Sequence, residues 1–348
     1  MRKLLLFLLL LIPINVYGID TSAKSSILMD MDTKRVLYGE NINYQQSVAS
    51  ISKIMTAILA IESGKMDDIV VVGDEIDNSY GSGIYIKKGE KITLRDLVYG
   101  LMLRSGNDAS YAIAHHVAGD EFVDLMNKKA KELGMINTIF NNPNGLDEES
   151  GNYSTVYDMA ILTSYAMKNE EYKKIVSTKQ HTLKTNMNTY VWFNKHKLLF
   201  SLDYVTGGKT GFTQKAKRTL VTTAKKNNLN LVAVTLNDGN DFIDHKNMFE
   251  YGFANFYKTK VIEKGYLTIQ DTIYYNKYNL KIKKNFTYTF HNNDKVYLQF
   301  NLDEKPKEGK VGEVEVILNK KMIYKDNIYA EKVVRDKLSL WERIKKIW

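Results

Sequence analysis

Apolar and polar residues alternate along the chain in patterns that predict both strands and helices. Residues 25–39 hold two apolar runs separated by "DMDTK", which is the pattern of a β-hairpin. A helix is expected to begin near Ser50, because the chain is almost wholly apolar from Ile54 onward. Residues 219–236 predict two further strands, "TLVTTA" and "LVAVTL", joined by the turn "KKNNLN". A helix over residues 244–257 is expected to close this part of the chain.

Two more helices are predicted in "TLRDLVYGLMLRSGNDASYAIAHHVAG", with a turn at "RSGND" between them. Thr93 and Asp96 form a capping-box pattern at the start of the first helix. Asn107 or Asp108 is expected to cap the second helix. The polar segment 141–155, which contains Pro and Gly, predicts a loop before helical spacing returns.

The pattern changes after residue 257. Residues 260–330 hold many short β-type runs, such as "FTYTF" and "EVEVIL", with turn residues between them. This spacing predicts an all-β, sandwich-like module. Because 348 residues exceed the usual size of one domain, we expect a first domain over residues 19–257 and a β-rich domain over residues 258–330.

The first 18 residues have the pattern of a secretory signal peptide. Arg2 and Lys3 form a basic start, an apolar core follows, and "VYG" supplies a small-residue cleavage site. A core of about nine apolar residues is too short to span a bilayer, so export with cleavage is favoured over a retained anchor. Cleavage removes two cations and no anions and lowers the formal net charge from +9 to +7. The mature chain is therefore expected outside the cytoplasm, at the outer face of the membrane or in the cell-wall space.

The tail, residues 331–348, predicts an amphipathic helix. Val334, Leu338, Trp341 and Ile344 fall on one face at steps of three and four residues. Six cations stand against three anions in this segment. A basic helix with Trp on its apolar side is typical of a helix lying in a membrane interface, so the membrane surface is an expected partner. The alternative is a helix docked on its own domain.

Composition narrows the choice of partners and cofactors. The chain has no cysteine, and its six histidines show no metal-ligand spacing, so neither a metal site nor another cofactor is expected. Its basic residues are spread out and form no patch interleaved with aromatic residues, which argues against nucleic acid. An anionic envelope polymer or a membrane surface fits the positive charge better.

Three serines precede the lysine of "QSVASISKIM", and one of them is placed to react with it. Positions i and i+3 share a helix face, so Ser50 Oγ and Lys53 Nζ can come within hydrogen-bond reach. Ser47 lies before the helix, and Ser52 points away from Lys53. Burial lowers the pKa of a lysine, so Lys53 can accept the proton of Ser50 and make it a nucleophile. The backbone N–H of Ser50 can donate to a developing oxyanion.

A second short motif, Ser105-Gly106-Asn107, stands in the turn between the two predicted helices. A hydroxyl and an amide on a tight turn can relay a proton and orient a substrate amide. Taken alone, this motif is more typical of a glycine turn with an asparagine cap.

A third motif, Lys209-Thr210-Gly211, is expected to open a strand. A lysine and a hydroxyl there suit the binding of a substrate carboxylate. The glycine would admit a ligand close to the backbone.

The three motifs occur in the order S-x-x-K, S-x-N and K-T-G, a set found in penicillin-binding proteins and class A β-lactamases. The chain resembles the low-molecular-weight penicillin-binding proteins that are serine-type D-alanyl-D-alanine carboxypeptidases. Blocks such as "GEKITLRDLVYGLMLRSGNDAS", "FNNPNGLDEESGNYSTVYDMA" and "GGKTGFTQKA" follow the family order over residues 23–257. "EGKVGEVEVILN" and the tail resemble the family's C-terminal β module and membrane anchor. The resemblance implies an α+β, β-lactamase/transpeptidase-like fold, with an antiparallel sheet, helices on both of its faces and a helical cluster.

The resemblance also implies a substrate, the D-Ala-D-Ala end of a peptidoglycan stem peptide. Ser50 would attack the penultimate carbonyl with Lys53 as the general base, and β-lactam antibiotics would acylate the same serine. Ser105 would help to pass the proton to the departing D-Ala. Asn107 would hold the substrate amide and Lys53.

The substrate-binding strand would contribute four residues under this resemblance. Lys209 and Thr210 would bind the terminal carboxylate, with Gly211 beside them. The backbone N–H of Phe212, together with that of Ser50, would form the oxyanion hole.

The chain departs from the family pattern at two places. Lys217 stands where the family usually has Gly, and no arginine stands near Asp241 in the sequence. Three alternatives remain: a DD-endopeptidase, which would use the same site, a β-lactamase, and a penicillin-binding scaffold whose site is weakened by Lys217. The β-lactamase fits worst, because Gly106 stands where Asp is wanted and only Glu148 and Glu149 are near enough to promote deacylation.

Overall fold

The computed structural model describes residues 19–77, 79–267, 275, 277–305 and 307–333. The described residues form two compact units, each with its own core. The first takes in residues 19–31, 36–224 and 231–252, and the second takes in residues 32–35, 225–230 and those from 253 onward. The segments expected to be a signal peptide (1–18) and most of the tail helix (334–348) lie outside the described residues.

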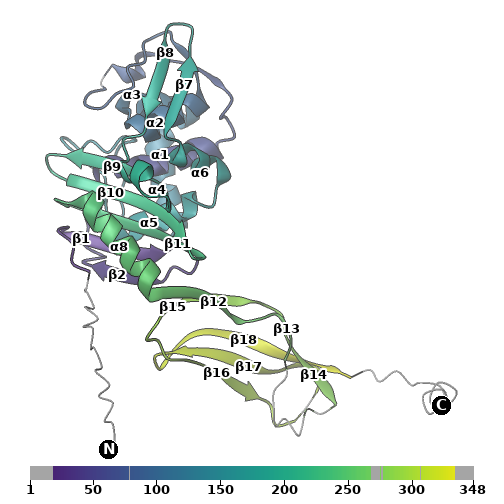
Figure 1. Cartoon of the computed structure of the whole chain (residues 1–348). Helices are drawn as coiled ribbons and strands as arrows, with labels where there is room; N and C mark the ends of the chain where they lie inside the picture. The colour runs from purple at the N-terminus through teal and green to yellow at the C-terminus, as the bar shows by residue number, and fades with distance from the viewer. Residues whose placement is uncertain (1–18, 78, 268–274, 276, 306, 334–348) are drawn as a thin grey trace, which may run out of the picture. The chain divides into compact units, whose positions relative to one another are not determined.

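A five-stranded sheet with the order β2-β1-β11-β10-β9 forms the centre of the first unit (Figure 1). Its strands are β1 Ser25–Asp30, β2 Val36–Glu40, β9 Val205–Thr213, β10 Lys217–Lys226 and β11 Leu229–Leu236. β1 pairs antiparallel with both β2 and β11, and β9 pairs antiparallel with β10. The hairpin over residues 25–39 and the two strands over residues 219–236 are therefore confirmed.

Helices lie on both faces of this sheet. The helices of this unit, some of which form a cluster away from the sheet, are α1 Lys53–Glu62, α2 Leu94–Arg104, α3 Asn107–Ala118, α4 Phe122–Glu132, α5 Val156–Ala166, α6 Glu170–Ser177, α7 Leu198–Ser201 and α8 Asp241–Asn255, with 3₁₀ turns η1 Ala49–Ser52, η2 Asp74–Ile76 and η3 Gly119–Glu121. Ile27 and Met29 of β1 enter the main core with α1 and α5, whereas Leu28 points to the opposite face. There α8 comes so close that a Cβ on Gly252 would lie 2.9 Å from Leu28.

Three short strand pairs complete the first unit. They are β3 Gln46–Ser47 with β6 Tyr153–Ser154, β4 Ile69–Val71 with β5 Lys91–Thr93, and β7 Gln180–Lys184 with β8 Thr189–Phe193.

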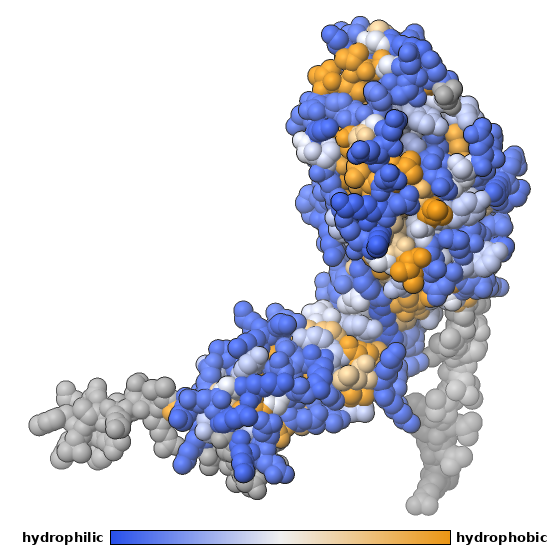
Figure 2. All heavy atoms as spheres, turned by 180° about the vertical axis from the view of Figure 1, so that it is seen from behind, coloured by the Kyte–Doolittle hydropathy of each residue, from blue (hydrophilic) through white to orange (hydrophobic). Residues whose placement is uncertain are grey.

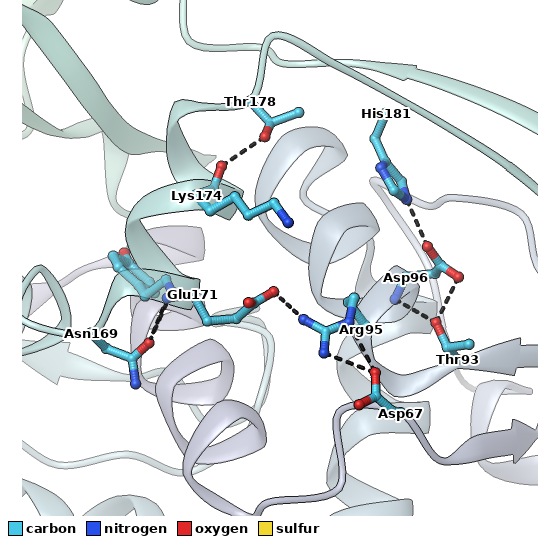
Figure 3. Close-up of polar contacts among 10 residues, drawn as sticks. Asp67, Thr93, Arg95, Asp96, Asn169, Glu171, Lys174, Thr178 and His181 are labelled. Atoms are coloured by element: carbon cyan, nitrogen blue, oxygen red, sulfur yellow. Dashed lines mark hydrogen bonds and ion pairs between the residues drawn. The ribbon is translucent and has the colours of Figure 1, made fainter.

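Polar side chains fix the β7–β8 hairpin and α6 against α2. Arg95 of α2 pairs with Glu171 of α6 (Figure 3). His181 of β7 lies 2.7 Å from the Asp96 carboxylate, and its ring stacks on Tyr99 with centroids 3.9 Å apart. The hairpin is thus held by a hydrogen-bond contact and a ring stack in addition to its apolar contacts.

The predicted caps are partly right. Thr93 Oγ1 accepts a hydrogen bond from Asp96 N and so caps α2, as predicted. The cap predicted for the next helix is wrong, because the N-cap of α3 is Gly106 and makes no side-chain bond. Asn107 is the first helical residue, and its side chain is bonded elsewhere.

Two buried histidines lie behind β9 and β10. His196 Nε2 lies 2.9 Å from Thr222 Oγ1, and His245 Nδ1 lies 2.8 Å from the same hydroxyl. Burial lowers the pKa of His196 to about 4. Both rings are therefore held in their neutral forms.

This burial predicts a loss of stability in mild acid. The pKa of unfolded histidine is about 6.5, so between that pH and about pH 4 the unfolded chain binds more protons than the folded one. The stability contribution of His196 is full above pH 6.5, and the free energy of unfolding should fall by up to about 3 kcal/mol as the pH drops through this window.

Urea unfolding at pH 7.5 and pH 5 would measure the loss. His196→Gln should reduce the difference between the two pH values, and the exposed His115→Gln should leave it unchanged. An equal loss in all three proteins would contradict the prediction.

The second unit is built from strands. Its two sheets are β12 Phe256–Ile262 with β15 Phe286–His291, and, in the order β13-β14-β18-β17-β16, β13 Gly265–Leu267, β14 Tyr278–Ile282, β18 Lys321–Lys332, β17 Gly309–Leu318 and β16 Val296–Leu302. Apolar side chains of both sheets share one core, as Ile262 and Val314 do.

The end of β18 corrects one sequence expectation. Because this strand runs to Lys332, the tail helix does not begin at residue 331. Among the described residues, no helix combines the length and apolar composition needed to cross a membrane. Hydrophilic residues dominate the visible surface, with apolar residues in small groups (Figure 2).

Candidate active site

Ser50 lies in the 3₁₀ turn η1, directly before α1 begins at Lys53. Lys53 Nζ donates a hydrogen bond to Ser50 Oγ at 3.0 Å. Ser52 Oγ donates instead to the Ala49 carbonyl at 2.9 Å, and Ser47 Oγ donates to a carboxylate in the loop after α4. The structure therefore brings one of the three serines to the lysine, and it is the one selected from the sequence.

The Lys53 ammonium is fully enclosed by the protein. Besides Ser50, its Nζ donates to Asn107 Oδ1 at 2.7 Å and to the Asn144 carbonyl. Burial holds the pKa of Lys53 well below its ordinary value, and the nearby Lys209 and Lys195 lower this pKa further. A lysine with a lowered pKa gives up its extra proton more readily, and the resulting amine can then accept the proton of the Ser50 hydroxyl.

Ser105 and Asn107 are positioned by the break between α2 and α3. Ser105 has a φ of +65°, a left-handed conformation that is uncommon for a residue other than glycine. The Asn107 amide nitrogen Nδ2 donates to the Tyr80 carbonyl at 2.5 Å, which turns its Oδ1 toward Lys53. The motif thus acts as more than a glycine turn, because its asparagine side chain joins the Lys53 site.

Lys209 lies in the middle of β9 and not at its start, which corrects the sequence expectation. The strand begins four residues earlier because Val205, Gly207 and Gly208 already pair with β10. Lys209 is buried, its Nζ donates to the Thr210 carbonyl at 2.7 Å, and burial lowers its pKa to about 7.

Gly211 permits β9 to lie against the serine turn. A Cβ on Gly211 would stand 3.0 Å from Ser50 N and 2.4 Å from Thr219 Oγ1. The backbone of β9 can therefore approach Ser50 only because position 211 carries no side chain.

Five of the eight predicted residues meet at one cavity of about 420 Å³. Of the residues selected from the sequence, those that line it are Ser50, Ser105, Thr210, Gly211 and Phe212. The other three, Lys53, Asn107 and Lys209, are buried and are not among its described lining residues. Five lining residues were missed from the sequence, and these are Ser82, Lys195, Arg218, Asp241 and Phe242.

The arginine that the sequence lacks near Asp241 is supplied in space by β10. Arg218 donates through Nε to the buried Asp241 carboxylate at 3.1 Å and also pairs with it through Nη2. Its guanidinium lies 5.6 Å from the centroid of the Phe242 ring. A cation is therefore present beside Asp241, although no arginine is near it in the sequence.

Lys217 accepts the backbone conformation that a glycine would favour. Its φ is +58°, its side chain is exposed, and it is not among the described residues lining the cavity. The β9–β10 pairing continues without a break from Arg218 opposite Phe212 to Thr223 opposite Gly207. The lysine therefore leaves the strand geometry intact.

Residues of the 141–155 loop also reach the serine turn. A Cβ on Gly145 would lie 2.1 Å from the Ala49 carbonyl, and the Asn144 carbonyl accepts from Lys53. Neither Glu148 nor Glu149 is among the described residues that line the cavity. The β-lactamase alternative therefore gains no support from this loop.

A serine hydrogen-bonded to a buried lysine, beside a sheet covered by helices, is characteristic of serine hydrolases in which lysine replaces histidine as the general base. The chain belongs to the D-alanyl-D-alanine carboxypeptidase family, whose model matches residues 14–240.

Similar proteins agree with this assignment. The chain is 42% identical over 220 residues to the D-alanyl-D-alanine carboxypeptidase DacF of Bacillus subtilis. This alignment covers 61% of this chain and 56% of that protein. It is 32% identical over 279 residues to DacA, a D-alanyl-D-alanine carboxypeptidase of Haemophilus influenzae, covering 74% of this chain and 68% of that protein.

A solved structure is similar over a longer part of the chain. The crystal structure of penicillin binding protein 5 from Haemophilus influenzae has a TM-score of 0.77 and 29% sequence identity, covering 91% of this chain and 98% of that one. The predicted fold class, a sheet with helices on both faces, is confirmed.

Proposed function

We propose that the protein is a serine DD-carboxypeptidase that removes the terminal D-Ala from peptidoglycan stem pentapeptides. The observation that carries this proposal is the 3.0 Å hydrogen bond between Lys53 Nζ and Ser50 Oγ, in a site whose burial lowers the pKa of Lys53. Family membership and the D-alanyl-D-alanine carboxypeptidases similar to this chain support the substrate.

The reaction would run through an ester on Ser50. Lys53 takes the hydroxyl proton while Ser50 Oγ bonds to the penultimate D-Ala carbonyl carbon. The backbone N–H groups of Ser50 and Phe212 hold the negative oxygen that forms. Ser105 helps to return the proton to the nitrogen of the departing D-Ala as the amide bond breaks. Water then hydrolyses the ester and restores the serine.

Substrate orientation would come from the second and third motifs, whose residues line the cavity or lie directly behind its lining. Asn107 holds the substrate amide, and Thr210 with the protonated Lys209 binds the terminal carboxylate. Penicillin would acylate Ser50 in the same way and remain attached. The mature protein would act outside the cytoplasm, with the tail after β18, residues 334–348, lying on the membrane surface.

A single experiment separates this function from its rivals. The full chain is incubated with a fluorescent penicillin and with a D-Ala-D-Ala pentapeptide, beside Ser50→Ala. We expect stable labelling and D-Ala release by the native chain and neither by the variant. Labelling without D-Ala release would indicate a scaffold, and rapid penicillin turnover would indicate a β-lactamase.

We expect Arg218 to help Thr210 and Lys209 to bind the terminal carboxylate of the substrate. Its pairing with Asp241 uses Nε and Nη2, and we expect Nη1 to reach the substrate carboxylate. A hydrogen bond to a charged group contributes about 1.5–3 kcal/mol, so Arg218→Ala should raise KM by about 10- to 100-fold and change kcat less. Steady-state kinetics would check this, with Lys217→Ala as the control that removes a neighbouring cation outside the cavity. A fall in kcat at unchanged KM would refute the assignment.

The membrane proposal has its own test. Deleting residues 334–348 should abolish co-sedimentation of the protein with anionic liposomes, because this segment holds the apolar face and most of the tail's cations. Unchanged co-sedimentation would rule out the tail as the anchor.

A further inference from the structure

The loop over residues 141–155 carries a buried carboxylate, Asp147, that the proposed reaction does not use. Its Oδ2 accepts hydrogen bonds from two hydroxyl groups, which are Ser47 Oγ and, at 2.7 Å, Thr213 Oγ1. Asp147 was not selected from the sequence, and it is not among the described residues that line the Ser50 cavity. Burying a carboxylate costs free energy unless it is hydrogen-bonded, so these two contacts are what allow Asp147 to stand there.

The two hydroxyl groups belong to the two chain segments that would form the oxyanion hole. Ser47 ends β3 and lies three residues before Ser50. Thr213 ends β9 and directly follows Phe212. In the proposed reaction, the backbone N–H groups of Ser50 and Phe212 hold the negative oxygen. One carboxylate oxygen therefore joins the two segments that carry these two donors.

The Thr213 side chain is held in one orientation by a second hydrogen bond. Its Oγ1 accepts from Ala216 N at 2.9 Å and gives its one proton to Asp147. Ala216 lies in the turn between β9 and β10. A shift of the Asp147 carboxylate would therefore move the end of β9, and with it the N–H group of Phe212.

The loop that carries Asp147 is itself fixed in place. Asn142 Oδ1 accepts hydrogen bonds from the backbone N–H groups two and three positions later in the loop. On the side of α1, the Pro143 carbonyl accepts from the buried Thr56 Oγ1 at 2.6 Å. Because the loop is bonded both within itself and to α1, it can hold Asp147 steady against the end of β9.

We propose that Asp147 is a positioning residue that sets the spacing of the oxyanion hole, by holding the Ser47 and Thr213 segments together. This inference rests on the proposed function of the Ser50 site. Negative charge develops on the carbonyl oxygen only as Ser50 Oγ bonds to the carbonyl carbon, so the spacing of the hole matters most in that step. Loss of Asp147 should therefore slow acylation and change the preceding binding of the substrate little.

The test measures acylation in the full chain, native and with Asp147→Ala or Asp147→Asn. An asparagine oxygen can accept both hydroxyl protons, whereas alanine accepts neither. Stopped-flow penicillin binding separates the acylation rate constant from the dissociation constant of the complex that precedes it. We expect Asp147→Ala to acylate about 10- to 100-fold more slowly, with the dissociation constant changed less than about twofold. Asp147→Asn should recover most of the lost rate.

Two control variants separate this role from a general loss of packing. Asp158→Ala removes another buried carboxylate, which accepts hydrogen bonds from Asn137 N and Thr138 Oγ1. Lys215→Ala removes an exposed contact, with the Tyr153 hydroxyl, between the same loop and the turn after β9. We expect both controls to acylate at the native rate, and Asp158→Ala to show a lower free energy of unfolding in urea.

A peptide that ends in a boronic acid gives a second readout. Its adduct with Ser50 is tetrahedral and places an oxygen in the oxyanion hole, so it resembles the transition state. The affinity for this peptide should fall in Asp147→Ala by about the same factor as the acylation rate. If Asp147→Ala does not fold, Thr213→Val takes its place, because it keeps the side-chain volume and removes one of the two hydroxyl groups. This variant should slow acylation in the same way, by a smaller factor.

Three outcomes would overturn the inference. The first is acylation at the native rate by Asp147→Ala, or by Thr213→Val where that variant replaces it. The second is equal slowing in Asp147→Ala and Asp158→Ala, which would indicate an effect of packing alone. The third is slow acylation by Asp147→Asn, which would show that the site needs the negative charge and not the two hydrogen bonds. A native chain that penicillin does not acylate would instead refute the proposed function itself.

Discussion

Replacing Lys53 with methionine is expected to slow the acylation of Ser50 by about 10²- to 10⁴-fold, the range that general acid–base catalysis contributes. Methionine keeps most of the volume of the side chain but has no group that can accept the Ser50 proton. It also leaves Asn107 Oδ1 and the Asn144 carbonyl without the donor that now joins them. The loss should appear in both penicillin labelling and D-Ala release, because both begin with the same proton transfer.

Lys53→Arg separates proton transfer from charge. An arginine keeps a positive charge beside Ser50 but cannot give up its proton at any accessible pH. If Lys53 is the base, the arginine variant should be as slow as the methionine variant. Activity retained by Lys53→Arg would show that the site needs a cation and not a base. Thermal unfolding of both variants checks that the fold has survived, since each changes a fully buried position.

The pH dependence of the native enzyme is an independent test of Lys53 as the general base. Burial and the nearby Lys209 and Lys195 ammonium groups lower the pKa of Lys53. The amine is active when neutral, so kcat/KM should fall as the pH drops through the lowered pKa and should hold above it. Lys209 should work in the opposite direction, because in the proposed reaction its protonated form binds the substrate carboxylate, and its pKa is lowered to about 7. Weaker substrate binding is therefore expected above that pH, and a pH profile of kcat/KM would show both limbs.

The parts of the site that could be predicted from the sequence are those set by local geometry. Ser50 and Lys53 are three residues apart on a helical turn, so their contact follows from the helix period alone. The order of the three motifs then pointed to Asn107 and Lys209, but the predicted local structure around each was wrong. Lys209 was expected at the start of a strand and lies in the middle of β9. Asn107 or Asp108 was expected to cap α3, but the Asn107 side chain is hydrogen-bonded to Lys53 and to the Tyr80 carbonyl.

The parts that could not be predicted depend on tertiary contacts between distant segments. Arg218 follows directly after Lys217, yet only the pairing of β9 with β10 and the start of α8 bring it to Asp241. The Asn144 group that contacts Lys53 is a backbone carbonyl. Every residue has such a carbonyl, so the sequence does not show which residue makes this contact. Lys195 reaches the cavity from the segment after β8, where a single lysine has no distinguishing pattern.

Replacing Gly211 with alanine is expected to lower the acylation rate by about 10²-fold with only a modest loss of stability, because a displacement of about 1 Å at a reacting group has an effect of that size. The added Cβ would stand 3.0 Å from Ser50 N and 2.4 Å from Thr219 Oγ1, and both distances are too short for ordinary contact. Either β9 or the serine turn must move, and either movement changes the relation between Ser50 N and the backbone of Phe212. Stopped-flow penicillin binding would measure the effect on acylation, and urea unfolding would measure the stability, for which overpacking costs about 1–3 kcal/mol.

Two further variants identify which contact is responsible. Gly239→Ala is the matched control, because a Cβ there meets only Ser22 Oγ at an ordinary 3.8 Å. The double variant Gly211→Ala/Thr219→Ala removes the Thr219 contact and keeps the one with Ser50. We expect it to recover stability without recovering the acylation rate, because Thr219 Oγ1 otherwise donates only to the Val48 carbonyl and takes no part in the reaction. Recovery of both would show that the strand pairing sets the rate, and that the close approach of β9 to Ser50 is a packing feature without a role in catalysis.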